Sequence, residues 1–238
     1  MRTQWLHRED RDALLFFFSG WGVDTRPFSH FAAKDYDVLF CDSYTTANNI
    51  DTNKLGLGHY KKKVVVGWSM GVLIGEQVLG NSSLSIEEGY AVNGTLCPVN
   101  IKYGIDPHWF CKTLETFEQN VLEKFYKRMC LKNDILTFFK ERKPERTQES
   151  LQKELEVLYE LGNGAYRKSL LFSKAIISCR DMIIPTKNQR EFWEKQSVPV
   201  EMTDEPHYCF FGMKSWDQLL NTLRSTSKKT LIAVNERK

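Results

Sequence analysis

The sequence predicts an α/β fold, in which a mostly parallel sheet is flanked by helices and carries a helical insert. Short apolar runs rich in β-branched and aromatic residues alternate with longer helical patterns, the order that parallel strands and their crossover helices require. The alternation stops between residues 105 and 166, where the chain becomes helix-forming and highly charged. At 238 residues, the chain is long enough for one core with such an insert.

The predicted strands are runs of five or six residues with the apolar, β-branched or aromatic content of buried strands. In chain order they are residues 13–18 (ALLFFF), 37–41 (DVLFC), 63–67 (KVVVG), 89–93 (GYAVN), 174–178 (KAIIS) and, more weakly, 198–202 (VPVEM). Helical patterns lie between or after them at residues 70–79, 187–196 and 215–224. This spacing suits right-handed crossover connections.

The segment 105–166 is predicted to be a helical lid insert in a single domain, whose core is formed by residues 1–104 and 167–238. Leu151, Leu155, Leu158 and Tyr159 recur at i, i+4, i+7 and i+8, the stripe of an amphipathic helix. Turn-forming residues flank the segment, which is expected where an insert leaves and rejoins a sheet. They are Gly104 and Pro107 on one side and Gly162, Asn163 and Gly164 on the other.

Composition and charge exclude several classes of protein. Hydrophobic residues make up 42% and charged residues 26%, as in ordinary globular proteins. A net charge of +3 is too small to indicate nucleic-acid binding, and no apolar run is long enough to span a membrane. The first ten residues lack the apolar region of a secretory signal, so we expect a cytoplasmic protein. Six scattered cysteines without a CxxC pair predict neither a metal site nor redox work, and we expect a monomer without cofactors.

The most informative motif is G-x-S-x-G at Gly67, Ser69 and Gly71, which directly follows a β-branched run and precedes a helical pattern. A serine in this sharp strand-to-helix turn adopts a strained backbone and projects into a site. The backbone N–H of Met70, at the start of the following helix, is placed to stabilise an oxyanion. The motif therefore predicts a nucleophilic serine, whereas a simple Gly-Ser-Gly turn is the alternative.

A second oxyanion donor is expected in the loop after the strand at residues 13–18. There, Gly20 and Gly22 flank Trp21, so the backbone can approach a substrate closely. We predict that the Trp21 N–H donates to the oxyanion and that its indole forms a wall of the acyl pocket. An aromatic plug over a tight turn is the other interpretation.

A serine nucleophile needs a base and an acid that orients it, in the chain order Ser, Asp or Glu, His for hydrolases with this turn. Asp181 follows the strand at 174–178, and His207 is the only histidine that comes after it. We therefore predict Asp181 as the acid and His207 as the base. Asp42 and Asp204 are alternative acids.

Five segments together resemble the α/β-hydrolase fold and, more closely, the BioG-type pimeloyl-acyl-carrier-protein methyl ester esterases. They are FSGWG (18–22), VGWSMG (66–71), VNGTLCP (92–98), SCRDMIIP (178–185) and DEPHY (204–208). The resemblance implies hydrolysis of the methyl ester at the far end of a pimeloyl chain on acyl-carrier protein, releasing methanol in biotin synthesis. One departure is Ser19, where many α/β-hydrolases have histidine.

The insert also carries a basic segment that suits an acidic carrier protein. Residues 124–146 contain eight basic and three acidic side chains, a local charge of +5. Such a surface would steer an acidic partner, although a solvated helix surface is the commoner reason for such lysines. The predicted docking residues are Lys124, Lys127, Arg128, Arg142 and Arg146, of which the last two are expected to share a helical face at i and i+4.

Three other functions remain open at this stage. An acyl thioesterase or a general short-chain carboxylesterase would use the same three residues on a different carbonyl. A non-catalytic binding protein with a hydrolase fold would keep the pocket without needing all three of Ser69, Asp181 and His207.

Overall fold

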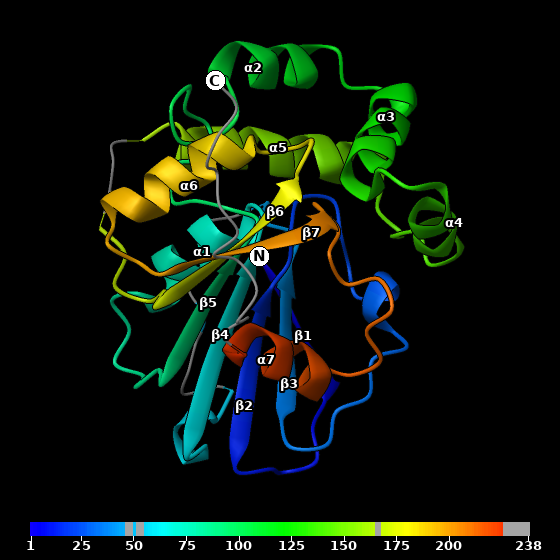
Figure 1. Ribbon diagram of the computed structural model, residues 1–238. Coiled ribbons are helices and arrows are strands. Elements are labelled where there is room, and N and C mark those ends of the chain that lie inside the picture. The colour runs from blue at the N-terminus through cyan, green and yellow to red at the C-terminus, as the bar shows by residue number, and fades with distance from the viewer. Residues whose placement is uncertain (46–49, 51–54, 165–167, 226–238) are drawn as a thin grey trace, which may run out of the picture.

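The computed structural model describes residues 1–45, 50, 55–164 and 168–225. Its core is a seven-stranded sheet of order β1-β3-β2-β4-β5-β6-β7, and only the edge strand β1 pairs antiparallel (Figure 1). The strands are β1 (Arg2–His7), β2 (Ala13–Phe18), β3 (Asp37–Asp42), β4 (Lys62–Trp68), β5 (Glu88–Val92), β6 (Lys174–Arg180) and β7 (Val200–Pro206).

All six predicted strands are confirmed, with ends that shift by a few residues. The sequence missed β1, because RTQWLH is neither a continuous apolar run nor a clear polar–apolar alternation. Its place comes from pairing with β3, where the Arg2 guanidinium donates to both carboxylate oxygens of Asp42 at 2.8 and 2.9 Å. A strand held by such contacts across the sheet has little local signal.

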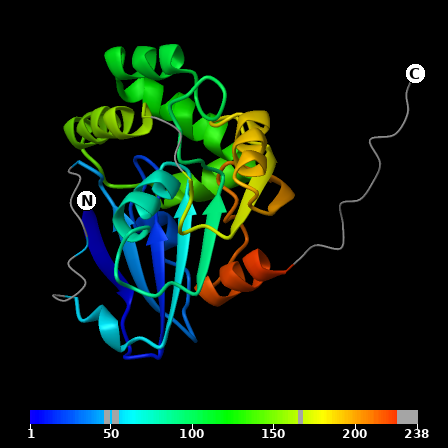
Figure 2. The same ribbon diagram turned by 90° about the vertical axis from the view of Figure 1, so that its left-hand side faces the viewer.

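The helices α1 (Gly71–Leu79), α6 (Thr186–Lys195) and α7 (Trp216–Arg224) confirm the three predicted between or after strands. Helix α1 packs against β2 and β4 on one face of the sheet, and α7 lies on the opposite face (Figures 1 and 2). Both faces of the central strands are therefore covered, which explains why Phe16, Phe17 and Phe18 are all fully buried and read as an unbroken apolar run.

Between β5 and β6 the described residues form four helices: α2 (Pro107–Glu115), α3 (Gln119–Cys130), α4 (Asn133–Glu141) and α5 (Gln148–Gly162). They lie beyond the carboxyl ends of the parallel strands (Figures 1 and 2). The chain before α2 and the end of α5 lie side by side, since the Val99 N–H donates to the Gly162 carbonyl at 3.4 Å. Residues 165–167, where the predicted insert ends and the core resumes, lie outside the described residues, and the division into core and lid stays a prediction.

The predicted stripe on α5 faces inward, with Leu151, Leu155 and Leu158 buried and Tyr159 half-buried. The helix begins where the Thr147 hydroxyl accepts the Ser150 N–H, an N-cap that satisfies one otherwise unpaired amide. Helix α5 is therefore packed onto the core along its length. No helix in the described part of the chain is long and apolar enough to cross a membrane.

Candidate active site

Ser69 occupies the turn between β4 and α1 with a φ of 57°, the left-handed conformation expected of this motif. The turn is tight because Gly71 passes against β2: a Cβ on Gly71 would lie 2.1 Å from the Phe18 carbonyl oxygen. The Ser69 N–H donates to Val92 O at 2.9 Å, so the turn is also fixed to β5. Ser69 is 4% exposed and lines a cavity. The close packing of Gly71 and the bond to β5 thus fix the backbone of Ser69.

His207 lies in the loop after β7, fully buried, with its ring next to Asp181. The distance from His207 Nδ1 to Asp181 Oδ2 is 2.8 Å, so Nδ1–H donates to the carboxylate. His207 Nε2 is buried without a hydrogen-bond partner among the described residues. With Nδ1 protonated, Nε2 has the free lone pair that a general base needs.

Asp181 follows β6 and has every carboxylate oxygen oriented by donors. The backbone N–H groups of Ile183 and Ile184 donate to Oδ1 at 2.8 and 2.9 Å. The Gln189 Nε2 donates to Oδ2 at 2.8 Å, beside His207. Sequence reasoning missed Gln189, whose only local signal is its place one turn into the helix after the Asp181 loop. Four donors therefore orient the two carboxylate oxygens of Asp181.

The alternative acids are engaged elsewhere. Asp42 receives both guanidinium bonds of Arg2, and the exposed Asp204 receives two from Arg180 at 2.7 and 2.9 Å. Asp181, and not Asp42 or Asp204, therefore lies against the His207 ring.

Asn93 is a second residue that sequence reasoning did not assign to the site. It has a φ of 48° just after β5, and its Nδ2 donates to the His207 carbonyl at 2.9 Å and to Ser178 Oγ at 2.8 Å. The Trp68 indole donates to the same His207 carbonyl at 3.0 Å. The backbone of His207 is thus fixed to residues beside Ser69 and to the end of β6.

Trp21 and Met70 line the same cavity as Ser69. The volume of this cavity is about 330 Å³. Within the described part of the chain, neither backbone N–H has a hydrogen-bond acceptor. The Trp21 indole packs against Phe125 and Phe117 and donates to the Leu151 carbonyl at 3.0 Å. Two free amides beside a buried serine are what stabilisation of an oxyanion requires, and Trp21 is one of the residues that line the cavity.

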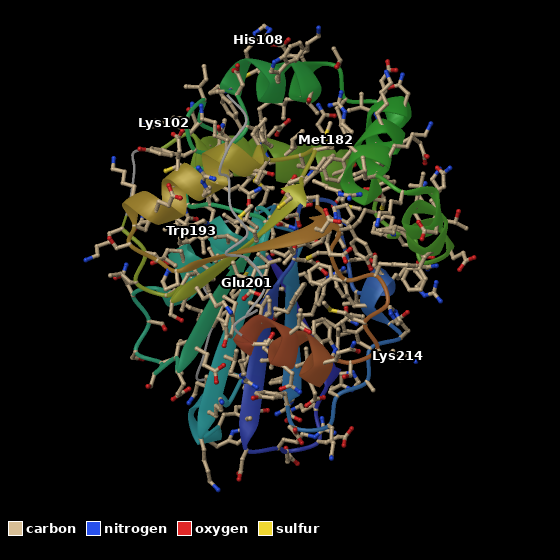
Figure 3. All side chains as sticks on the ribbon, in the orientation of Figure 1. Lys102, His108, Met182, Trp193, Glu201 and Lys214 are labelled. Atoms are coloured by element: carbon tan, nitrogen blue, oxygen red, sulfur yellow. The ribbon has the colours of Figure 1, made fainter. Side chains whose placement is uncertain are left out.

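The rest of the cavity wall comes mainly from the helices beyond the strands. Met182, labelled in Figure 3 just beyond the end of β6, lies on the side where α2 and α3 are found. The lining is mostly apolar, with basic side chains from α2 and α3. Besides Trp21, Ser69 and Met70, the cavity is lined by Ile105, Trp109, Phe110, Lys112, Thr113, Thr116, Val121, Lys124, Phe125, Arg128, Leu155, Met182 and Ile183. Such a wall suits an apolar group, and its basic side chains suit an anion.

The predicted docking residues separate into two groups. Lys124, Lys127 and Arg128 are exposed on α3, and two of them line the cavity. Arg146 is not a docking residue: its side chain is 5% exposed and its Nη2 lies 3.1 Å from the Glu154 carboxylate. The guanidinium of Arg142 instead packs over the Phe138 ring and pairs with Glu141.

The shared helical face predicted for Arg142 and Arg146 is also wrong. Helix α4 ends at Glu141, and α5 begins only at Gln148. Pro144 lies between them, and proline disfavours helix in the residue before it and lacks the N–H that an uninterrupted helix needs.

The buried cysteines are poorly suited to nucleophilic chemistry. Burial raises the pKa of the Cys130 thiol to about 12 and also raises the pKa of Cys41 and Cys209. Thiols with such pKa values stay protonated at neutral pH. Among the residues that the structure describes, no cluster of three His, Cys, Asp or Glu side chains could hold a metal ion.

Solved structures with low identity share this fold. A lipase-esterase related protein from Clostridium acetobutylicum superposes with a TM-score of 0.66 at 14% identity, covering 93% of this chain and 98% of that one. MenH from S. aureus gives a TM-score of 0.61 at 13% identity, over 92% and 95%. The chain has the α/β-hydrolase fold.

Closer relatives narrow the family. A malonyl-[acyl-carrier protein] O-methyltransferase of Bacteroides fragilis is 34% identical over 94% of this chain, but the chain spans only 44% of that protein's length. The crystal structure of BioG from Haemophilus influenzae has a TM-score of 0.82 at 28% identity, covering 92% of this chain and 99% of that one. The family model for pimeloyl-ACP methyl esterase BioG matches residues 1–219. The chain belongs to the BioG family of pimeloyl-ACP methyl esterases.

Proposed function

We propose that this protein is a serine esterase that hydrolyses the methyl ester of pimeloyl-[acyl-carrier protein] methyl ester, with Ser69, His207 and Asp181 as its catalytic triad. One observation carries the proposal. Ser69 and two unpaired amides, those of Trp21 and Met70, line one largely apolar cavity. The Asp181–His207 pair supplies a base whose Nε2 is free.

The reaction proceeds in two steps that these residues share. In the first, Ser69 Oγ attacks the ester carbonyl while His207 Nε2 takes the hydroxyl proton, and the Trp21 and Met70 amides bind the oxyanion. The carbon–methoxy bond then breaks, and His207 returns the proton to the leaving oxygen as methanol. In the second, His207 takes a proton from water, which attacks the acyl-enzyme; the free acid leaves and Ser69 recovers its proton.

The Bacteroides relative supports a carrier-bound methyl ester as substrate. Its name describes transfer of a methyl group to an oxygen of a malonyl group on acyl-carrier protein. Such a transfer creates the class of bond that this chain would break. Because this chain spans less than half of that protein, the methyltransferase activity is not carried over to it.

The carrier protein is proposed to dock at α3. Lys124, Lys127 and Arg128 are exposed there, and no ion pair engages them within the described residues. The neighbouring Lys140 and Lys143 are paired with Glu123 instead. An acidic carrier at this face would stand beside the cavity, because Lys124 and Arg128 form part of its wall.

Charge reversal of the double variant Lys124→Glu and Arg128→Glu is expected to lower kcat/KM on the carrier-bound ester. We expect a fall of roughly 10- to 100-fold at low salt, shrinking as salt rises, because screening weakens exposed charges. Turnover of a small soluble ester, which needs no docking, should change little. The measurement is kcat/KM for both substrates at 20 mM and 500 mM salt, where these concentrations span roughly the range from weak to strong screening.

Lys34→Glu with Lys61→Glu is the matched control. Both lysines are exposed. Lys34 precedes β3 and Lys61 precedes β4, so they lie at the amino ends of the parallel strands, opposite the end where α3 is found. Equal losses in the two double variants would contradict docking at α3.

Analysis of the products tests the proposed function itself. Purified protein is incubated with pimeloyl-carrier-protein methyl ester, and mass spectrometry follows the methyl group and the thioester; enzyme inactivated by a serine-directed phosphonate is the blank. We expect methanol release with the thioester intact. Cleavage of the thioester would point to the thioesterase. A lack of turnover on this and on short esters, with no labelling of Ser69, would point to the binding protein.

A further inference from the structure

Glu154 is a carboxylate in the middle of an apolar helix face. It is 0% exposed and lies on α5 beside Leu151, Leu155 and Leu158, which are also buried. Acidic side chains are almost never fully buried unless they are paired, because the charge loses its hydration. What Glu154 contacts therefore has to account for its place.

Its oxygens accept backbone N–H groups from two distant loops. Oε2 accepts the Gly22 N–H at 3.2 Å, and Oε1 accepts the Tyr44 N–H at 2.9 Å. Gly22 is the residue after Trp21, whose own N–H is the proposed oxyanion donor. Gly22 has a φ of 71°, and a Cβ there would lie 3.1 Å from Leu151 Cδ2. The loop thus approaches α5 closely at the carboxylate.

Side chains of Tyr44 and Trp21 also tie the same loop to its surroundings. The Tyr44 hydroxyl shares its one proton between the Ser19 carbonyl at 2.8 Å and the Cys41 carbonyl at 2.9 Å. The Trp21 indole donates to the Leu151 carbonyl, one turn before Glu154 on α5. The Ser19–Gly20 and Trp21–Gly22 peptides, one before and one after the Trp21 N–H, are therefore held by α5 and by a loop that α5 anchors.

A buried cation compensates the charge of Glu154. The Arg146 Nη2 lies 3.1 Å from Oε2, and both side chains are almost fully buried. Burial raises the pKa of Glu154, which the Arg146 charge and the two amide donors oppose. The Arg146 guanidinium also donates to Ser150 Oγ through Nε and Nη2, whereas its Nη1 is buried without a hydrogen-bond partner among the described residues.

We propose that Glu154 is a positioning residue for ester hydrolysis, which aligns the Trp21 amide with the oxyanion by holding Gly22 and Tyr44 against α5. Helix α5, which lies in the segment predicted as a lid, then forms part of the oxyanion site. This inference rests on the proposed serine mechanism. It goes beyond it by naming a group that touches no reacting atom.

The test compares two ligands that differ only at the carbon beside the carbonyl: 1,1,1-trifluoro-2-octanone and 2-octanone. The first forms a tetrahedral adduct with an activated serine and needs the oxyanion donors, whereas the second binds only by its chain. In Glu154→Gln, an amide N–H₂ replaces one acceptor and faces a backbone donor. We expect affinity for the trifluoro ketone and kcat to fall together by roughly 10- to 100-fold, with affinity for 2-octanone nearly unchanged.

Glu154→Asp is the second variant, since it keeps the charge beside Arg146 but retracts the carboxylate by one methylene; it should show the same selective loss. Glu160→Gln, exposed on the same helix, is the control and should match wild type. Circular dichroism melts establish that each variant is folded. Should Glu154→Gln fail to fold, Glu154→Asp decides the test.

Two results would overturn the positioning role. One is a folded Glu154 variant that keeps the full preference for the trifluoro ketone. The other is loss of folding in both variants, because Glu154 would then serve the fold and not the loop geometry. A wild type that neither turns over esters nor forms the adduct would instead refute the proposed function, so the two failures are distinguishable.

Discussion

Replacing Ser69 with alanine is expected to abolish ester hydrolysis, lowering kcat by about 10⁶-fold, the loss seen when a serine hydrolase loses its nucleophile. The hydroxyl is the only group removed, and within the described residues no hydrogen bond uses it. The backbone bond from Ser69 to Val92 and the tight contact at Gly71 stay in place. Chemistry should therefore be lost while the fold and the cavity remain.

The measurement is burst and steady-state kinetics of wild type and Ser69→Ala on the carrier-bound methyl ester. Thermal melts and binding of 2-octanone establish that the variant keeps its structure. Ser82→Ala, in the turn after α1, is the control, since its hydroxyl only donates to the Leu79 carbonyl. If Ser69→Ala kept more than about 1% of the wild-type kcat, far above the rate expected without a nucleophile, the attack would have to be assigned to another group.

Replacing Asp181 with asparagine is expected to lower kcat by about 10⁴-fold, because it fixes the wrong tautomer of His207. The amides of Ile183 and Ile184 donate to Oδ1, so the oxygen of an asparagine would stay there. Its N–H₂ would then face His207 Nδ1 in place of Oδ2. Nδ1 would become the acceptor and Nε2 would carry the proton, which leaves Ser69 without a base.

This result would be measured as kcat on a small soluble ester, so that carrier docking does not enter. Asp204→Asn is the matched control, because Asp204 is an exposed carboxylate that binds Arg180, whereas Asp181 binds the His207 ring. We expect it to keep nearly all activity. A larger loss in Asp204→Asn than in Asp181→Asn would make Asp204 the acid.

Strands and the serine turn were open to prediction because their causes are local. A buried parallel strand is apolar over its whole length, as in residues 13–18, and the turn at Ser69 needs small neighbours two residues away on either side. The edge strand β1 was missed because its stability comes from pairing with β3 and from Arg2 on Asp42. Local pattern carries no information about such a partner.

The docking set shows the same limit for charge. A basic segment of +5 is visible in the sequence, yet burial decides which of its members can meet a partner. Arg146 pairs inside the protein with Glu154, whereas Lys124 and Arg128 reach the cavity wall. Residue type alone does not separate these two fates.

By itself, the sequence determined the α/β architecture, the serine turn and the order of Ser69, Asp181 and His207 along the chain, since these follow from spacing and from the small set of backbone shapes each motif allows. Only the tertiary structure decided that Asp181 meets His207, that Asn93 and Gln189 orient this pair, and that Glu154 holds the loop of Trp21. The Glu154–Gly22 bond joins residues 132 positions apart. Such contacts arise when distant segments bury their polar groups together, and each group must then find its partner in space and not in sequence.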